Sequence, residues 1–123
     1  MAVYLNDVVL DAGLTLMDTE IDYLYICNAL PDTHTEASAT FKIGYKATPT
    51  VSAAGDAGGG GRKITVTAIT DGTIDSADTA THWALADTAA TTLYAAGTLN
   101  APVVVAIGTF TLTTFDITFP DAV

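Results

Sequence analysis

No residue between Asp87 and Asp116 carries a charge, although the whole chain has a formal net charge of −10. Thr, Val and Ala recur in this stretch, and β-branched residues favour extended strands. An exposed, uncharged strand edge invites uncontrolled pairing with other strands. We therefore expect a strand-rich fold in which the core, or a neighbouring subunit, covers the charge-free stretch, and we favour a neighbouring subunit for part of it.

The second half of the chain predicts a hairpin and a closing strand. His82–Ala86 and Leu93–Ala96 lie on either side of the small polar segment Asp87–Thr92, as the two arms of a β-hairpin would. From Phe110 to Phe119, apolar residues alternate with Thr and Asp, which indicates a strand. The alternation changes phase at Thr113-Thr114, which predicts a bulge or bend there.

The first half predicts one helix and two strands. Apolar residues three and four positions apart predict a helix from Asn6 to about Met17, which Gly13 weakens by about 1 kcal/mol relative to Ala. The run Ile21–Cys27 is apolar on both faces, which predicts a central strand. The alternating segment Phe41–Lys46 predicts a strand with one buried and one solvated face.

Glycine and aspartate mark the expected loops between these elements. The segment Pro49–Gly61 ends in four glycines, so we expect a flexible loop there. Strand periodicity resumes at Ile64–Ile69. The pair Asp71-Gly72 then predicts a turn before a short extended stretch that ends near Asp78.

With 123 residues, the chain fits one ordinary domain, residues 1–123, and is large enough to hold a core without disulfides or metals. We expect a mainly β fold, an antiparallel β-sandwich with one N-terminal helix packed at its side or end. A partly open β-barrel is the alternative.

The charge balance argues against two classes of partner. Four basic residues face fourteen acidic ones, so phosphate backbones and anionic lipid surfaces should repel the chain, and we expect it to bind neither nucleic acid nor membranes. The sequence lacks the pattern of a signal peptide and any apolar run long enough to span a bilayer. The lone Cys27 lies in an apolar run, which suits a buried, unreactive thiol in a reducing cytoplasm.

Motifs for phosphate and zinc sites are incomplete. The run Gly58–Gly61 with Arg62 and Lys63 lacks the spacing of a phosphate-binding loop and leads into a strand, so we expect a plain loop whose basic residues could contact an acidic partner. His34 and His82 have no spacing that would gather zinc ligands with each other or with the cysteine.

The oxygen-rich segment with Asp71, Asp75 and Asp78 could bind calcium or supply carboxylates for acid–base catalysis. The EF-hand order and its closing Glu are absent, and Asp is a common turn residue. Three serines lack the context of an activated nucleophile, namely Ser38, Ser52 and Ser76. We therefore predict no catalytic, cofactor-binding or metal-binding residue and no enzyme. A small hydrolase or lyase using Asp71, Asp75 or His82 is the least favoured hypothesis.

Several segments carry a resemblance to a known class of proteins. They are Ile69–Thr73, Thr79–Asp87, Leu93–Leu99, Gly108–Leu112 and Phe115–Ala122, and in the first half the helix, the strand ending at Cys27, Thr33–Ala37 and Gly61–Lys63. In these segments the chain resembles small virion-associated proteins of tailed bacteriophages. The resemblance covers most of the chain, but it consists of packing and turn residues, and none of them carries a reaction.

The resemblance implies a structural protein present in many copies in the virion, assembled in the cytoplasm of the host bacterium. The expected role is a capsid decoration or cement protein that binds the major capsid protein or other virion proteins and stabilises the head. Attachment to the tail or its tip, as a receptor-binding or adaptor protein, is the alternative. Symmetric association commonly covers an uncharged edge, so we expect a homo-oligomer and favour a trimer.

Overall fold

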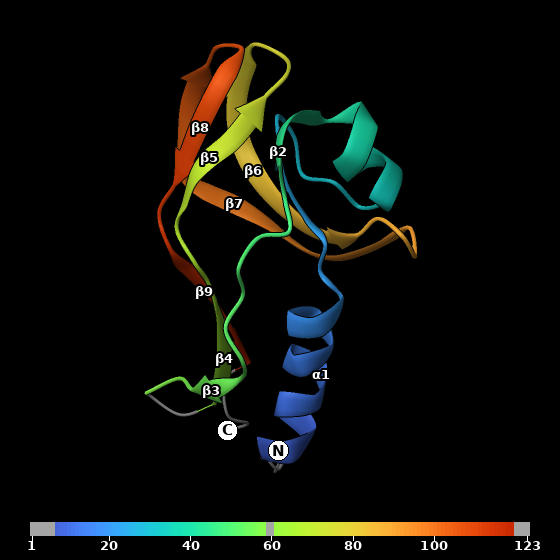
Figure 1. The fold of residues 1–123 in the computed structure, drawn as a ribbon, viewed down its shortest axis with the longest axis vertical. Helices are drawn as coiled ribbons and strands as arrows, with labels where there is room; N and C mark the ends of the chain where they lie inside the picture. Colours follow the sequence, from blue (N-terminus) through green and yellow to red (C-terminus); the bar gives the residue numbers. More distant parts are fainter. Residues whose placement is uncertain (1–6, 59–60, 120–123) are drawn as a thin grey trace, which may run out of the picture. The chain divides into compact units, whose positions relative to one another are not determined.

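The computed structural model describes residues 7–58 and 61–119 (Figure 1). They form two compact units, and each is described by itself. The half-barrel unit contains residues 21–49 and 69–112, and the helix unit contains residues 7–20, 50–58, 61–68 and 113–119.

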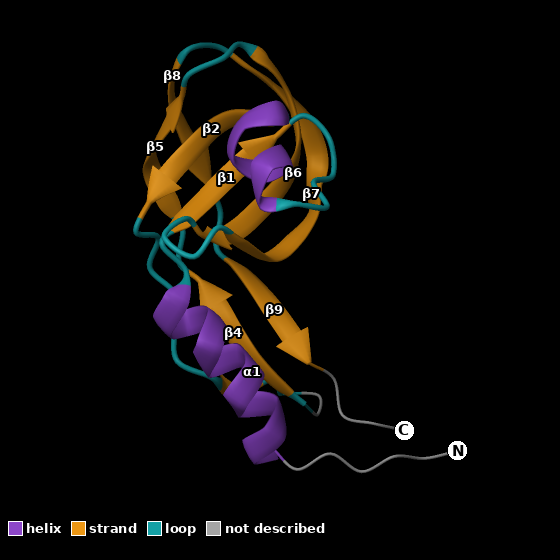
Figure 2. Cartoon of the chain, turned by 90° about the vertical axis from the view of Figure 1, so that its right-hand side faces the viewer, coloured by secondary structure: helices purple, strands orange, loops and turns teal. Residues whose placement is uncertain are grey.

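The half-barrel unit is a six-stranded antiparallel sheet that curls into half of a barrel (Figure 2). In sheet order its strands are β7 (Thr92–Val105), β6 (Asp78–Asp87), β1 (Tyr23–Cys27), β2 (Lys42–Ala47), β5 (Ile69–Ile74) and β8 (Gly108–Leu112). The mainly β, antiparallel class with one N-terminal helix is thereby confirmed. The curl makes the larger sheet similar to the partly open barrel that the sequence left as the alternative.

Strand β1 is central, as predicted, because it pairs with β2 on one side and with β6 on the other. Side chains alternate across a strand, so Leu24 and Ile26 face one side of the sheet while Tyr25 and Cys27 face the other. All four are buried, which explains why the run is apolar on both faces. On the Tyr25 side the core also contains Ala37, Ala84 and Ala86. Partly buried hydrophobic residues pack against this cluster: Tyr23, Phe41, Tyr45, Leu93 and Ala96.

Part of this cluster comes from a π-helical turn, η1 (Glu36–Thr40), which sequence periodicity did not reveal. Its Ala37 is fully buried, and the Phe41 N–H donates to the Glu36 carbonyl over 2.8 Å. The Glu36 carboxylate accepts a hydrogen bond from the Asp32 N–H at 3.0 Å. A turn this short contains too few apolar positions to show a helical repeat.

The helix unit combines α1 (Asp7–Glu20) with a three-stranded sheet in the order β3 (Gly55–Asp56), β4 (Arg62–Val66) and β9 (Phe115–Phe119). The predicted helix is confirmed and continues beyond Met17, whereas its predicted first residue, Asn6, lies outside the described residues. Four buried side chains form the core of this unit: Leu14, Met17, Ile64 and Val66.

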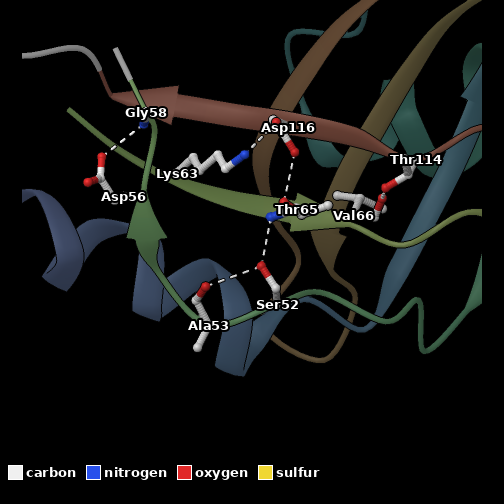
Figure 3. Close-up of polar contacts among 9 residues, drawn as sticks. All are labelled: Ser52, Ala53, Asp56, Gly58, Lys63, Thr65, Val66, Thr114 and Asp116. Carbon is white, nitrogen blue, oxygen red and sulfur yellow. Dashed lines mark hydrogen bonds and ion pairs between the residues drawn. The ribbon is translucent and has the colours of Figure 1, made fainter. Parts of the chain in front are cut away.

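Hydroxyl and carboxylate groups link the strands of the helix unit, as Figure 3 shows. The Asp116 carboxylate on β9 accepts hydrogen bonds from Thr65 Oγ1 at 2.7 Å and from Lys63 Nζ at 3.1 Å, both on β4. Thr114 Oγ1 donates to the Val66 carbonyl at 2.8 Å. These contacts fasten β9 to β4 in a register that runs from Arg62 opposite Phe119 to Val66 opposite Phe115.

Three local predictions need correction. The run Ile64–Ile69 is not one strand, because it divides after Val66 between β4 in one sheet and β5 in the other. The pair Asp71-Gly72 is not a turn, because both residues lie within β5. The expected flexible loop Pro49–Gly61 contains the strand β3, which pairs with Arg62 and Lys63.

The predicted break at Thr113-Thr114 is real and larger than a bulge. Strand β8 ends at Leu112 in the six-stranded sheet, and β9 begins at Phe115 in the three-stranded sheet. The change of phase in the sequence therefore marks the point where the chain leaves one sheet for the other.

Candidate interaction surface on the edge strand β7

Strand β7 is one edge of the six-stranded sheet and contains half of the charge-free stretch. Its pairing with β6 confirms the predicted hairpin, with Leu85 opposite Ala95 and His82 opposite Thr98. The strand continues past the predicted arm to Val105. Only one side of β7 has a neighbouring strand among the residues that the structure describes.

A bulge divides β7 into two parts. Val103 lies opposite Ala80 and Thr98 lies opposite His82, so residues 99–102 of β7 face the single residue Thr81 of β6. Pro102, which has no N–H to donate, lies in this bulge, and a proline in a sheet is tolerated at an edge or a bulge.

After the bulge, β7 presents apolar side chains to solvent. Val103 is 51% exposed, Val104 is 83% exposed, and Ile107 in the link to β8 is 73% exposed. Because consecutive residues of a strand point to opposite faces, both faces are open at Val103 and Val104. We call residues 103–107 the apolar edge. A two-residue link joins β7 to β8, and the apolar edge ends before Gly108, the first residue of β8, whose φ of 147° suits glycine.

A carboxylate stands beside this apolar edge. Asp78 on β6 lies opposite Val105, and its Oδ2 accepts a hydrogen bond from Asn28 Nδ2 at 2.8 Å. The Thr79 N–H donates to the other carboxylate oxygen at 2.7 Å. The Asn28 hydrogen bond and then the Thr79 hydrogen bond lower the pKa of Asp78, so the group is charged at neutral pH. Asp78 forms no ion pair with any described residue.

All four Lys and Arg side chains form ion pairs with aspartates of the same chain. The ion pairs are Lys42 with Asp75 at 2.9 Å, Lys46 with Asp71 at 3.0 Å, Arg62 with Asp11 at 2.7 Å and Lys63 with Asp116 at 3.1 Å. Arg62 and Lys63, which the sequence offered to an acidic partner, therefore contact acidic groups of the same unit.

The three aspartates considered as calcium ligands have different partners in the structure. Asp71 pairs with Lys46, Asp75 pairs with Lys42, and Asp78 bonds to Asn28. A calcium site needs several oxygen ligands that converge on one point. Among the described residues no group of three His, Cys, Asp or Glu side chains is placed to hold a metal ion.

A polar network around His34 was not predicted from the sequence. His34 Nδ1 lies 3.5 Å from Ser38 Oγ, and His34 Nε2 lies 3.5 Å from Thr88 Oγ1, which shares a 2.8 Å hydrogen bond with the Tyr25 hydroxyl. The imidazole thus lies between two hydroxyl groups, whereas a catalytic triad places it between a hydroxyl and a carboxylate. The four-residue spacing of His34 and Ser38 could have revealed this contact if the segment had been recognised as helical.

Cys27 is buried, as its apolar run predicted. Burial raises the pKa of the Cys27 thiol from 9.0 to about 12, so the reactive thiolate is scarce at neutral pH. His82 lies opposite Cys27 in the β1–β6 register, and its Nδ1 lies 2.7 Å from Thr81 Oγ1.

The remaining candidates have structural contacts. The glycine-rich segment joins β3 to β4, and the Gly58 N–H donates to Asp56 Oδ1 at 2.8 Å within it (Figure 3). Ser52 Oγ accepts a hydrogen bond from the Thr65 N–H at 2.9 Å and donates to the Ala53 carbonyl at 3.2 Å. Ser76 lies in the turn between β5 and β6, where its N–H donates to the Ile43 carbonyl at 3.2 Å.

Comparison with family models, with curated proteins and with solved structures finds no match to this chain. In the part of the chain that the structure describes, α1 and the other helical segment are too short or too polar to span a bilayer.

Proposed function

We propose that this chain is a structural component of a tailed-phage particle, a capsid decoration or cement protein that binds the major capsid protein and stabilises the head. The observation that carries the proposal is the apolar edge of β7, which is uncharged and open on both faces in a strongly acidic chain. Monomeric soluble proteins usually protect such an edge, so its exposure favours a protein that works by binding other proteins.

Two further features support a binding role over catalysis. The aspartates and histidines singled out by the sequence do not converge on a common point among the described residues. The sequence resemblance to small virion proteins covers most of the chain and involves packing residues. We therefore assign no catalytic residue, and we place the protein in the virion after assembly in the host cytoplasm.

The proposal includes self-association on the particle, with a trimer as the favoured form. The sheet has a second uncharged edge, β8, which offers another surface for contacts between copies. Sedimentation velocity of the purified chain tests whether the trimer forms before the chain binds the particle: a trimer mass supports a preformed trimer, and a monomer at all concentrations contradicts it.

The decisive experiment is immunogold labelling of purified phage particles with an antibody against this chain, combined with mass spectrometry of the particle proteins. Label distributed over the head is expected. Particles that contain none of the chain, despite its expression during infection, would overturn a virion role and favour reconsideration of an enzyme.

Placement at the tail or tail tip, as a receptor-binding or adaptor protein, is the second candidate. Three tyrosines gather on one side of β1 and β2: the Tyr23 and Tyr25 rings stack at 5.5 Å, and the Tyr23 and Tyr45 rings lie 6.0 Å apart. Tyr23 and Tyr45 are only partly buried, and partly exposed aromatic rings can contact sugars and other partners. Immunogold label confined to one end of the tail would select this candidate.

A further inference from the structure

We propose that the apolar edge of β7 takes up an extended apolar segment of a partner protein as an added strand, and that lysine or arginine residues flank this segment. The inference rests on the proposed function, because it specifies the chemistry of the partner that a virion structural protein would bind. It adds the mode of binding and the charge of the partner segment.

The backbone of the apolar edge is suited to strand addition. Residues 103–105 are already in a strand that pairs with Asp78–Ala80 on its inner side, and its outer side has no strand partner among the described residues. A strand fixed in this way keeps the outward N–H and C=O groups aligned, so an added strand gains hydrogen bonds without ordering the receptor. Binding also covers Val103 and Val104, whose exposure is otherwise unfavourable.

The charge distribution decides between the possible occupants. The half-barrel unit carries seven carboxylates and two ammonium groups, and both ammonium groups already pair with Asp71 and Asp75. A second copy of the chain would bring another net charge of −10 to the same edge, which opposes self-pairing there. A segment with basic flanks is attracted instead, and charge complementarity of this kind speeds association and excludes wrong partners.

Asp78 adds a negative charge next to the apolar edge. Asp78 lies opposite Val105 in the register of β6 and β7, and its carboxylate forms no ion pair with a described residue. Hydrogen bonds from Asn28 and Thr79 hold this carboxylate in place, so it supplies a fixed negative charge one strand inward from the apolar edge, which attracts a lysine or arginine in the partner segment.

The test uses three labelled synthetic peptides and the full chain, with fluorescence anisotropy for affinity and ¹⁵N NMR for location. The first peptide is Lys-Lys-Thr-Val-Thr-Val-Thr-Val-Lys-Lys. The second replaces its four lysines by glutamates, and the third keeps the lysines but replaces the first two valines by prolines, which removes backbone donors.

We expect the lysine-flanked peptide to bind at least about tenfold more tightly than either of the other two, because it alone combines both requirements. The NMR shifts should concentrate on residues 98–107 and on Asp78. Equal binding of the lysine and proline peptides would show simple charge attraction and would overturn the inference. The absence of binding by the lysine-flanked peptide would also overturn the inference, as would NMR shifts confined to another surface.

Two matched variants locate the effect. Val104→Lys introduces a cation at a side chain that is 83% exposed, whereas Leu30→Lys makes the same change in net charge at a side chain that is 52% exposed in a loop. We expect Val104→Lys to weaken the lysine-flanked peptide by about tenfold and Leu30→Lys to leave its affinity within about twofold. Equal effects of the two variants would contradict a site at the apolar edge.

The same variants separate this inference from the proposed function. If particles incorporate the wild-type chain and Leu30→Lys but not Val104→Lys, both the virion role and the edge assignment stand. If particles incorporate all three alike, the protein is a virion component and the edge assignment is wrong. If the peptides bind as expected but particles contain no wild-type chain, the edge assignment stands and the virion role falls. Protection of the amides of residues 103–107 by self-association of the wild-type chain would assign the edge to a second copy instead.

Discussion

The indole ring of Trp83 on β6 lies against Gly97, its direct neighbour across the sheet on β7. A Cβ atom added at Gly97 would come within 2.6 Å of Trp83 Cζ2, closer than real Cβ contacts permit. The pair Gly72 and Phe110 repeats this arrangement between β5 and β8, again as direct neighbours in register. In both pairs the glycine makes room for an aromatic ring that covers the neighbouring backbone.

We expect Gly97→Ala to destabilise the protein by about 1–3 kcal/mol, because the indole has to move out of a packed position. Chemical denaturation measures the loss, and the fluorescence of Trp83, the only tryptophan, reports the change in its surroundings. Gly55→Ala is the matched control, because nothing lies within 4 Å of its added Cβ. Equal stability of the two variants would show that the ring contact does not constrain position 97.

The buried thiol of Cys27 predicts a loss of stability in alkali. Burial raises its folded-state pKa from 9.0 to about 12, so the folded protein holds the proton that the unfolded chain releases. This contribution is complete below about pH 9 and is lost as the pH rises from about 9 to about 12. We expect the melting temperature of the wild type to fall more steeply over that range than that of Cys27→Ala. Parallel pH profiles would refute the assignment.

The same burial predicts slow thiol chemistry in the native state. At pH 8, a thiol-specific reagent should label Cys27 only after denaturant is added, because neither access nor thiolate is available in the folded protein. Rapid stoichiometric labelling without denaturant would mean that β1 is open to solvent.

The ion pair between Asp11 and Arg62 should anchor α1 to β4. Arg62 Nε donates to Asp11 Oδ1 at 2.7 Å and its Nη2 donates to Oδ2 at 3.2 Å, and the Asp11 side chain is 32% exposed. We expect Asp11→Asn to cost about 1 kcal/mol and to speed amide exchange in α1. Asp71→Asn is the control, because its pair with Lys46 leaves the Asp71 side chain 70% exposed, and such pairs contribute about 0–1 kcal/mol. An equal or larger loss in Asp71→Asn would contradict this ranking.

Asp116 should carry part of the acid sensitivity of the helix unit. The hydrogen bond from Thr65, followed by the Lys63 contact, lowers the pKa of Asp116 from its ordinary value of 3.8. Stability from this group is therefore present above about pH 4 and is lost as the pH falls through the lowered folded-state pKa. We expect Thr65→Val to raise the pKa of Asp116 in an NMR titration, whereas Thr67→Val, at an exposed position without that contact, should leave it unchanged.

The local pattern of residues was enough to identify most of the regular elements. A small polar segment between two apolar runs predicted the hairpin of β6 and β7, and helical spacing predicted α1. The double-sided apolar run predicted both the central place of β1 and the burial of Cys27, because such a run is stable only with cover on both faces. The charge-free stretch likewise pointed to an uncharged edge, and β7 provides it.

Apart from the hairpin of β6 and β7, tertiary structure alone decided which strands are neighbours. Alternation states which residues share a face, but it does not state which other strand pairs with them. For this reason the run Ile64–Ile69 looked like one strand although its two ends belong to different sheets. Asp71-Gly72 looked like a turn because those residues favour turns locally, whereas in the fold Gly72 gives space to the ring of Phe110 from a strand far along the chain. The apolar edge depends on both kinds of information: its composition is visible in the sequence, but its exposure follows from the position of β7 at the end of the sheet, which long-range pairing sets.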